Sequence, residues 1–201
     1  MLPEEELKKI VDLFDEVTDL MNRVMEIVLR IEEINVEPYR IYIIPGVLYD
    51  ITTGEVIDGM FEDDKKIIVG MLGTVPGMVA RYVISKKLGL RLAAHSYEFG
   101  EHLNILSYYA YLNLLPGDFK NPMIFFELVI TCLLKVLAHE RAKDLEKRIT
   151  NIYREIVYKY DPILSPEDRR RIVKMYYERH KRIFEEVLEG RYLLLPSDRI
   201  Y

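Results

Sequence analysis

Three side chains that could bind a metal ion recur at helical spacing in the middle of the sequence. They are His95, Glu98 and His102, separated by three and four residues. At about 100° per residue, these positions fall within an arc of about 60° on a helix, so both imidazoles and the carboxylate would project from one face. That face also carries core-like residues, and burying unpaired polar groups is costly. We therefore expect these three side chains to need a partner.

A catalytic zinc ion is commonly held by histidine and carboxylate side chains and keeps a further position for water. On this hypothesis the protein is a metal-dependent hydrolase. His95 and His102 would bind zinc or another divalent metal, and Glu98 would be a third ligand or the base that activates bound water. His139 is a further candidate ligand, but it shares a polar ridge with Lys143, which is typical of a solvent-facing edge. The alternative is a buried polar cluster in which hydrogen bonds satisfy both histidines.

No standard catalytic or nucleotide-binding motif accompanies these residues. The sequence lacks His-Glu-x-x-His, Gly-x-x-x-x-Gly-Lys, Gly-x-Gly-x-x-Gly and Gly-x-Ser-x-Gly. The sequence therefore gives no motif evidence that the protein is a zincin, a P-loop NTPase, a Rossmann enzyme or an α/β-hydrolase. This favours a non-enzymatic interaction or assembly protein as the leading hypothesis.

Residues 3–34 predict a long helix with a continuous apolar seam. The apolar positions alternate steps of four and three, which is the 3.5-residue repeat of a coiled coil. Such a seam favours a homo-oligomer that assembles through this helix. A second apolar row widens the stripe, and a widened stripe is typical of a helix packed on its own core. The predicted oligomer interface consists of Ile10, Phe14, Val17, Met21, Val24, Val28 and Ile31.

The pattern of elements predicts one domain over residues 1–201, of the helix-rich α+β class. The long helix occupies residues 1–34. Short β-branched and aromatic runs between turn signals in residues 35–72 predict a small antiparallel sheet, with its strands at about 39–71. Caps and helix-breaking residues predict a helical core of about four helices in residues 73–201.

The last predicted helix has a basic face that could contact nucleic acid through its phosphates. It begins at the cap signature of Ser165 and Asp168 and ends near Gly190, and residues 191–195 are predicted to form a short strand. Glutamates interrupt the basic face and the net charge is −5, which favours an ordinary solvated surface. Nucleic-acid binding is therefore the least favoured of the three hypotheses. Its basic residues are Arg170, Arg171, Lys174, Lys181 and Arg182.

Composition favours a cytoplasmic protein without a membrane span. The single cysteine cannot form an internal disulfide, and the first residues lack a signal-peptide pattern. The most apolar run, residues 123–138, contains two charged residues and is shorter than the roughly 20 residues that a spanning helix needs. The absence of glutamine, with 30% charged residues, is typical of hyperthermophile proteins.

Overall fold

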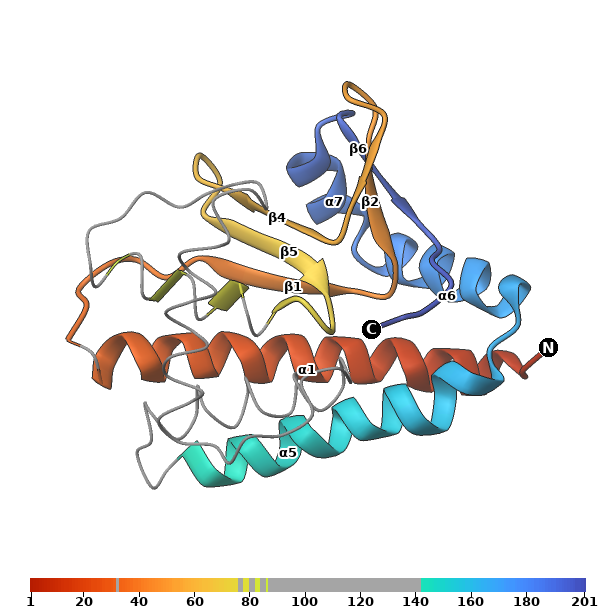
Figure 1. The fold of residues 1–201 in the computed structure, drawn as a ribbon, viewed down its shortest axis with the longest axis horizontal. Coiled ribbons are helices and arrows are strands. Elements are labelled where there is room, and N and C mark those ends of the chain that lie inside the picture. The colour runs from red at the N-terminus through yellow and green to blue at the C-terminus, as the bar shows by residue number, and fades with distance from the viewer. Residues whose placement is uncertain (32, 76–77, 80–81, 84–85, 87–141) are drawn as a thin grey trace, which may run out of the picture.

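A computed structural model describes residues 1–31, 33–75, 78–79, 82–83, 86 and 142–201 of the chain. These residues form a long N-terminal helix, two three-stranded sheets and a C-terminal series of helices (Figure 1). The predicted helix-rich α+β class is confirmed. In the described part of the chain, no helix is both long enough and apolar enough to cross a membrane.

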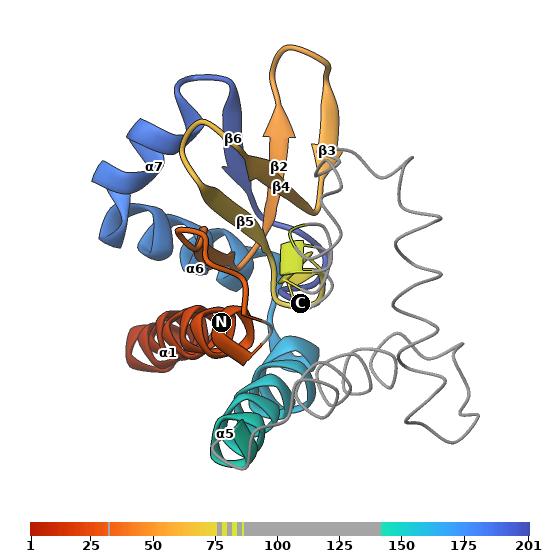
Figure 2. The same ribbon diagram turned by 90° about the vertical axis from the view of Figure 1, so that its left-hand side faces the viewer.

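The long helix α1 (Glu4–Ile31) confirms the helix that the apolar periodicity predicts. Three glutamates in its first turn favour the positive end of the helix dipole, and the carbonyl of Pro3 accepts hydrogen bonds from the amides of Glu6 and Leu7. The helix lies between the sheet that contains β1 (Arg40–Ile44) and helix α5 (Ala142–Arg154) (Figures 1 and 2). Both sides of α1 are therefore covered by the chain itself.

The strands form two sheets, rather than the single antiparallel sheet that the sequence predicts. The first has the order β1-β5-β4 and adds to β1 the strands β5 (Ile67–Met71) and β4 (Gly59–Glu62). The second has the order β3-β2-β6 and consists of β3 (Glu55–Ile57), β2 (Val47–Asp50) and β6 (Tyr192–Leu195). The pair β1 and β5 is parallel, and the other pairs are antiparallel. Strands β2 and β3 form a hairpin, and the predicted C-terminal strand is confirmed as β6.

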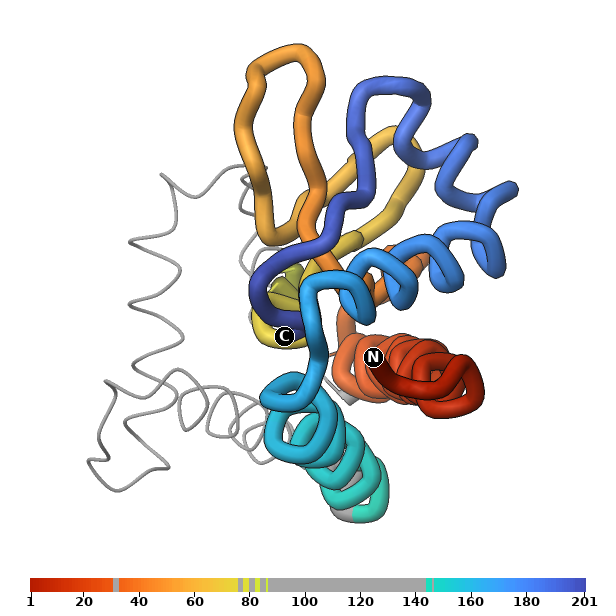
Figure 3. Tube along the Cα trace, turned by 90° about the vertical axis from the view of Figure 1, so that its right-hand side faces the viewer, coloured from red at the N-terminus to blue at the C-terminus, as the bar shows by residue number. Residues whose placement is uncertain are grey.

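A tight corner connects the two sheets. The chain leaves β1 and enters β2 through Gly46, beside the end of β6 (Figure 3). A Cβ atom on Gly46 would lie 2.2 Å from the carbonyl oxygen of Leu195. Only glycine therefore allows the backbone of β6 to approach the corner this closely.

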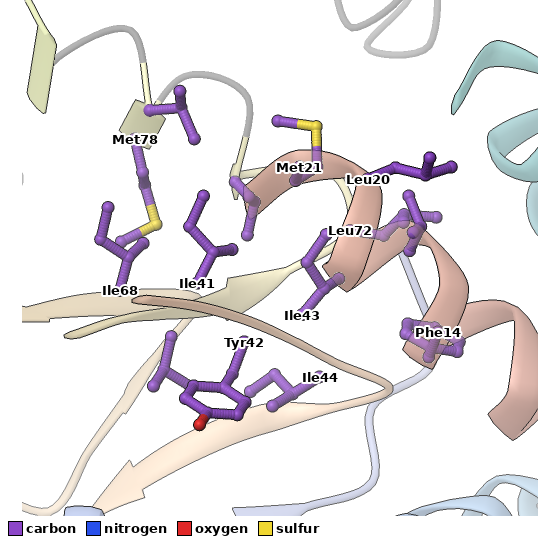
Figure 4. Packing of buried hydrophobic residues seen from close by; sticks show 14 of the residues in the cluster. Phe14, Leu20, Met21, Ile41, Tyr42, Ile43, Ile44, Ile68, Leu72 and Met78 are labelled. Atoms are coloured by element: carbon purple, nitrogen blue, oxygen red, sulfur yellow. The ribbon is translucent and has the colours of Figure 1, made fainter. Parts of the chain in front are cut away.

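Both faces of β1 are buried in the core. Ile41 and Ile43 point toward α1 and Met21, whereas Tyr42 points to the opposite side (Figure 4). There the Tyr42 ring lies 6.1 Å from the ring of Phe184. The sheet is thus held between α1 on one side and the C-terminal helices on the other.

The C-terminal segments follow α5 in the order π-helix (Glu155–Tyr160), 3-10 helix (Asp161–Ile163), α6 (Pro166–Arg179) and α7 (Lys181–Leu188). The predicted cap is confirmed, because Ser165 and Asp168 form a reciprocal capping box. The single helix predicted to end near Gly190 is instead two helices. They separate at His180, whose Nε2 lies 2.6 Å from the Asp15 carboxylate of α1. A contact with a distant helix thus accompanies a break that local sequence does not predict.

Candidate protein-interaction site

The apolar seam of α1 is buried within the chain's own core. The side chains of Ile10, Phe14 and Val17 are fully buried, and those of Met21, Val24 and Val28 are 1% exposed. The side chain of Ile31 lies outside the described residues. A partner helix could reach this seam only if the folded chain opened, so a site for a partner must be sought elsewhere.

The proposed metal ligands His95, Glu98, His102 and His139 lie outside the described residues. The metal-dependent hydrolase hypothesis therefore stays a prediction. Within the described part, no group of three or more histidine, cysteine, aspartate or glutamate side chains could hold a metal ion. Elemental analysis of the purified protein tests the hypothesis, which requires stoichiometric metal that disappears when His95 and His102 are both changed to alanine.

The basic face of α6 and α7 carries acidic partners. Four of its five predicted residues lie near a carboxylate: Arg170–Glu167 at 2.5 Å, Arg171–Asp168 at 3.7 Å, Lys181–Glu185 at 3.9 Å and Arg182–Glu186 at 3.8 Å. The fifth, Lys174, is exposed. These pairs reduce the positive potential that phosphate binding would use. Nucleic-acid binding remains an untested prediction.

One edge of the first sheet is closed by side chains of α1. The Asn22 amide donates to the carbonyl of Ile41 (3.0 Å), and its oxygen accepts from the Ile41 amide (2.8 Å). The Thr18 hydroxyl oxygen accepts from the amide of Ile43 (3.1 Å). The β1 backbone is therefore bonded on the side away from β5, without a further strand.

Among the described residues, the second sheet ends at β6, and no further strand pairs with its outer edge. The amide of Ile51 donates to the carbonyl of Arg191, and Leu193 is the register partner of Tyr49 in β2. Because hydrogen-bonded pairs alternate along an antiparallel ladder, Tyr192 and Leu194 direct their amide and carbonyl groups away from β2. No described residue forms a backbone hydrogen bond to these outward groups.

A groove runs along this open edge, between β6 and the two helices α6 and α7, which lie on the side of β6 away from β2 (Figure 2). Its volume is about 470 Å³, within the range of about 300–1,000 Å³ typical of ligand sites. The turn from α7 into β6 lies at one end, where Glu189 and Gly190 both have positive φ. The lining residues are Tyr177, Phe184, Glu185, Leu188, Gly190, Tyr192, Leu193, Leu194 and Leu195.

Glu185 is the charged member of this lining. Its carboxylate lies 3.9 Å from the Lys181 ammonium group, and both side chains are more than half exposed. A long, exposed ion pair of this kind contributes little. The nearby Lys65 is engaged elsewhere, because it pairs with Glu189 at 2.8 Å and donates to the Val187 carbonyl. In the described part of the chain, Glu185 thus has only this long ion pair, and its carboxylate is available to a new cation in the groove.

An ion pair fixes the entry of the chain into β6. Arg191 contacts the buried carboxylate of Asp50 at 3.1 Å, and Thr52 donates its hydroxyl to the same carboxylate at 2.6 Å. The Thr52 hydrogen bond, followed by that of Arg191, holds the pKa of Asp50 well below its ordinary value despite burial. The charged carboxylate thus anchors Arg191, and with it the start of β6, to the end of β2.

The sequence predicts the strand at residues 191–195 but gives no signal for the groove beside it. Whether a strand edge is open depends on which segments pack against it, and α6, α7 and β2 supply those surroundings. Comparisons of the chain with family models, with curated proteins and with solved structures find no match.

Proposed function

We propose that the protein is a non-enzymatic interaction protein that binds a partner chain at the open edge of β6. The observation that supports this proposal is the row of outward-directed backbone groups on Tyr192 and Leu194, lying beside an apolar groove. An unpaired strand edge is a template for a further strand. In strand addition, backbone hydrogen bonds supply affinity and the adjacent pocket supplies specificity.

The groove carries the features expected of such a pocket. Of its lining residues, Phe184 and Leu188 are buried, Tyr177 and Leu194 are half-buried, and Leu193 is 46% exposed. A partner that covered these partly exposed apolar groups would remove their surface from water, at a gain of about 25 cal/mol per Å². Edge pairing and apolar burial therefore act on the same partner.

This proposal moves the interaction surface from α1 to β6 and keeps assembly as the role. Sedimentation analysis will show whether the chain associates with itself. The α1 seam stays buried in either outcome, because its side chains form the core of the monomer. If the oligomeric state changes with protein concentration, a second copy of this chain becomes one of the partners to test at β6.

Selection of random peptides on the purified full-length protein tests the proposal. We expect enriched peptides whose affinity falls at least about tenfold in Leu194→Pro relative to Leu194→Ala. Both variants lose the leucine side chain, but only proline also removes the outward amide. Proline is tolerated on an edge strand where the lost N–H faces solvent, and circular dichroism will check that both variants fold. No enriched peptide, or equal binding to both variants, would refute the proposal.

A further inference from the structure

We infer that the β6 groove selects an extended segment with an apolar side chain facing α7 and a lysine or arginine placed against Glu185. This inference deepens the proposed function and rests on it. It assigns the partner a chemical class, an apolar and basic strand, through the juxtaposition of an open strand edge and one available carboxylate on the wall of the groove.

The shape of the groove favours a single extended segment. Strand β6 has four residues, and only Tyr192 and Leu194 direct backbone groups outward. The tight turn at Glu189 and Gly190 lies at one end and joins α7 directly to β6. A single extended segment could therefore pair with β6 while it lies against α7.

The apolar preference follows from the alternation of side chains along a strand. Every second side chain of an added strand points to the same face as those of Tyr192 and Leu194. The groove that such a side chain would enter is lined from the helices by Tyr177, Phe184 and Leu188. An aliphatic or aromatic side chain fits this surface, and a charged one placed there would lose hydration without a partner.

The basic preference follows from the position of Glu185. Its side chain is 57% exposed, and Lys181, at 3.9 Å, is 54% exposed, so their pairing is weak. A cation on the bound segment would reach Glu185 next to apolar surface, where water screens the pair less than in bulk solvent. An acidic residue at the same place would be repelled.

Exchange of charge between protein and peptide tests this inference. The most enriched peptide from the selection is synthesised with its basic residue and, separately, with glutamate in its place, and both are titrated against wild type and Glu185→Lys. We expect the basic peptide to bind Glu185→Lys about tenfold more weakly than wild type, and the glutamate peptide to show the reverse order. Glu178→Lys is the matched control, because it makes the same charge change at an exposed glutamate of α6 that does not line the groove.

Two results would overturn the inference while leaving the proposed function intact. One is enrichment of peptides that depend on the Leu194 amide but carry no basic residue. The other is an equal effect of Glu185→Lys and Glu178→Lys on the basic peptide. Failure of the proposed function is recognised separately, since it requires that Leu194→Pro and Leu194→Ala bind the peptides equally.

Discussion

The outer edges of β1 and β6 end their sheets in opposite ways. At β1, Asn22 and Thr18 of α1 hydrogen-bond to the amides of Ile41 and Ile43, and Asn22 also bonds to the Ile41 carbonyl. At β6, the outward groups have no backbone partner among the described residues and face a groove. An exposed edge is a liability that proteins usually cover. The difference indicates that this chain can close an edge with polar side chains, and it makes the open one the better place to look for a partner.

The closed edge also explains a polar interruption in the apolar pattern of α1. Thr18 is buried on the helix that packs against β1. A buried polar group is tolerated when it is hydrogen-bonded, and Thr18 accepts from Ile43. Its polarity therefore serves the sheet edge rather than solvent.

The largest expected effect is at the corner where β6 meets the first sheet. Gly46→Ala would put a Cβ atom 2.2 Å from the Leu195 carbonyl oxygen, so the end of β6 would have to move. We expect a loss of about 3 kcal/mol or more in the free energy of unfolding, measured by urea denaturation. Gly190→Ala is the control: it has positive φ but no atom within 4 Å of the added Cβ, so it should cost only about 1 kcal/mol. Equal losses in the two variants would contradict the role assigned to the corner.

We expect a somewhat smaller loss of stability when the edge of β1 loses its side-chain partners. Asn22→Ala removes the partners of both backbone groups of Ile41, and we expect a loss of about 2 kcal/mol in urea denaturation together with faster hydrogen exchange at the Ile41 amide. Asn151→Ala, at an exposed position of α5, should be close to neutral. If the two asparagine variants were indistinguishable, the edge would not depend on α1.

A fall in pH should weaken the contact of Asp50 with Arg191, which holds the start of β6. The pKa of Asp50 is lowered in the folded state, so its charge stabilises the fold above the ordinary aspartate value of about 3.9. That contribution is lost as the pH falls below this value toward the lowered folded-state pKa. Asp50→Asn should therefore be less stable than wild type at neutral pH and lose less stability between about pH 4 and pH 2. Urea midpoints across this range provide the measurement, with Asp198→Asn, at an exposed aspartate, as the control.

The smallest effect on stability is expected on the open edge itself. Leu193 is 46% exposed, so Leu193→Thr should change the free energy of unfolding by less than about 0.5 kcal/mol. The fully buried Leu48, in the neighbouring strand, provides the contrast, since Leu48→Ala should cost about 2–5 kcal/mol. A large loss for Leu193→Thr would mean that the open edge is part of the core rather than a surface for a partner.

Local sequence signals predict the helices and strands that depend on interactions between residues close in the sequence. Helix α1 follows from its apolar period and acidic first turn, and the start of α6 follows from the capping residues Ser165 and Asp168. The residues of β2, β3 and β6 also follow from short apolar runs between turn signals. By contrast, the seam of α1 is compatible in sequence with an oligomer or a core, because periodicity identifies a buried face without identifying what buries it.

The candidate site depended on contacts between distant residues. Strand β6 pairs with β2 across more than 140 residues of sequence, the parallel pairing of β1 with β5 departs from the expected antiparallel sheet, and His180 meets Asp15 from another helix. Caps, breakers and periodicity act within a few residues, so the sequence predicts α1, the start of α6 and the short strands without knowledge of the fold. The closed edge of β1 and the open edge of β6 could not be predicted in this way, because each depends on the packing of segments that lie far apart in the sequence.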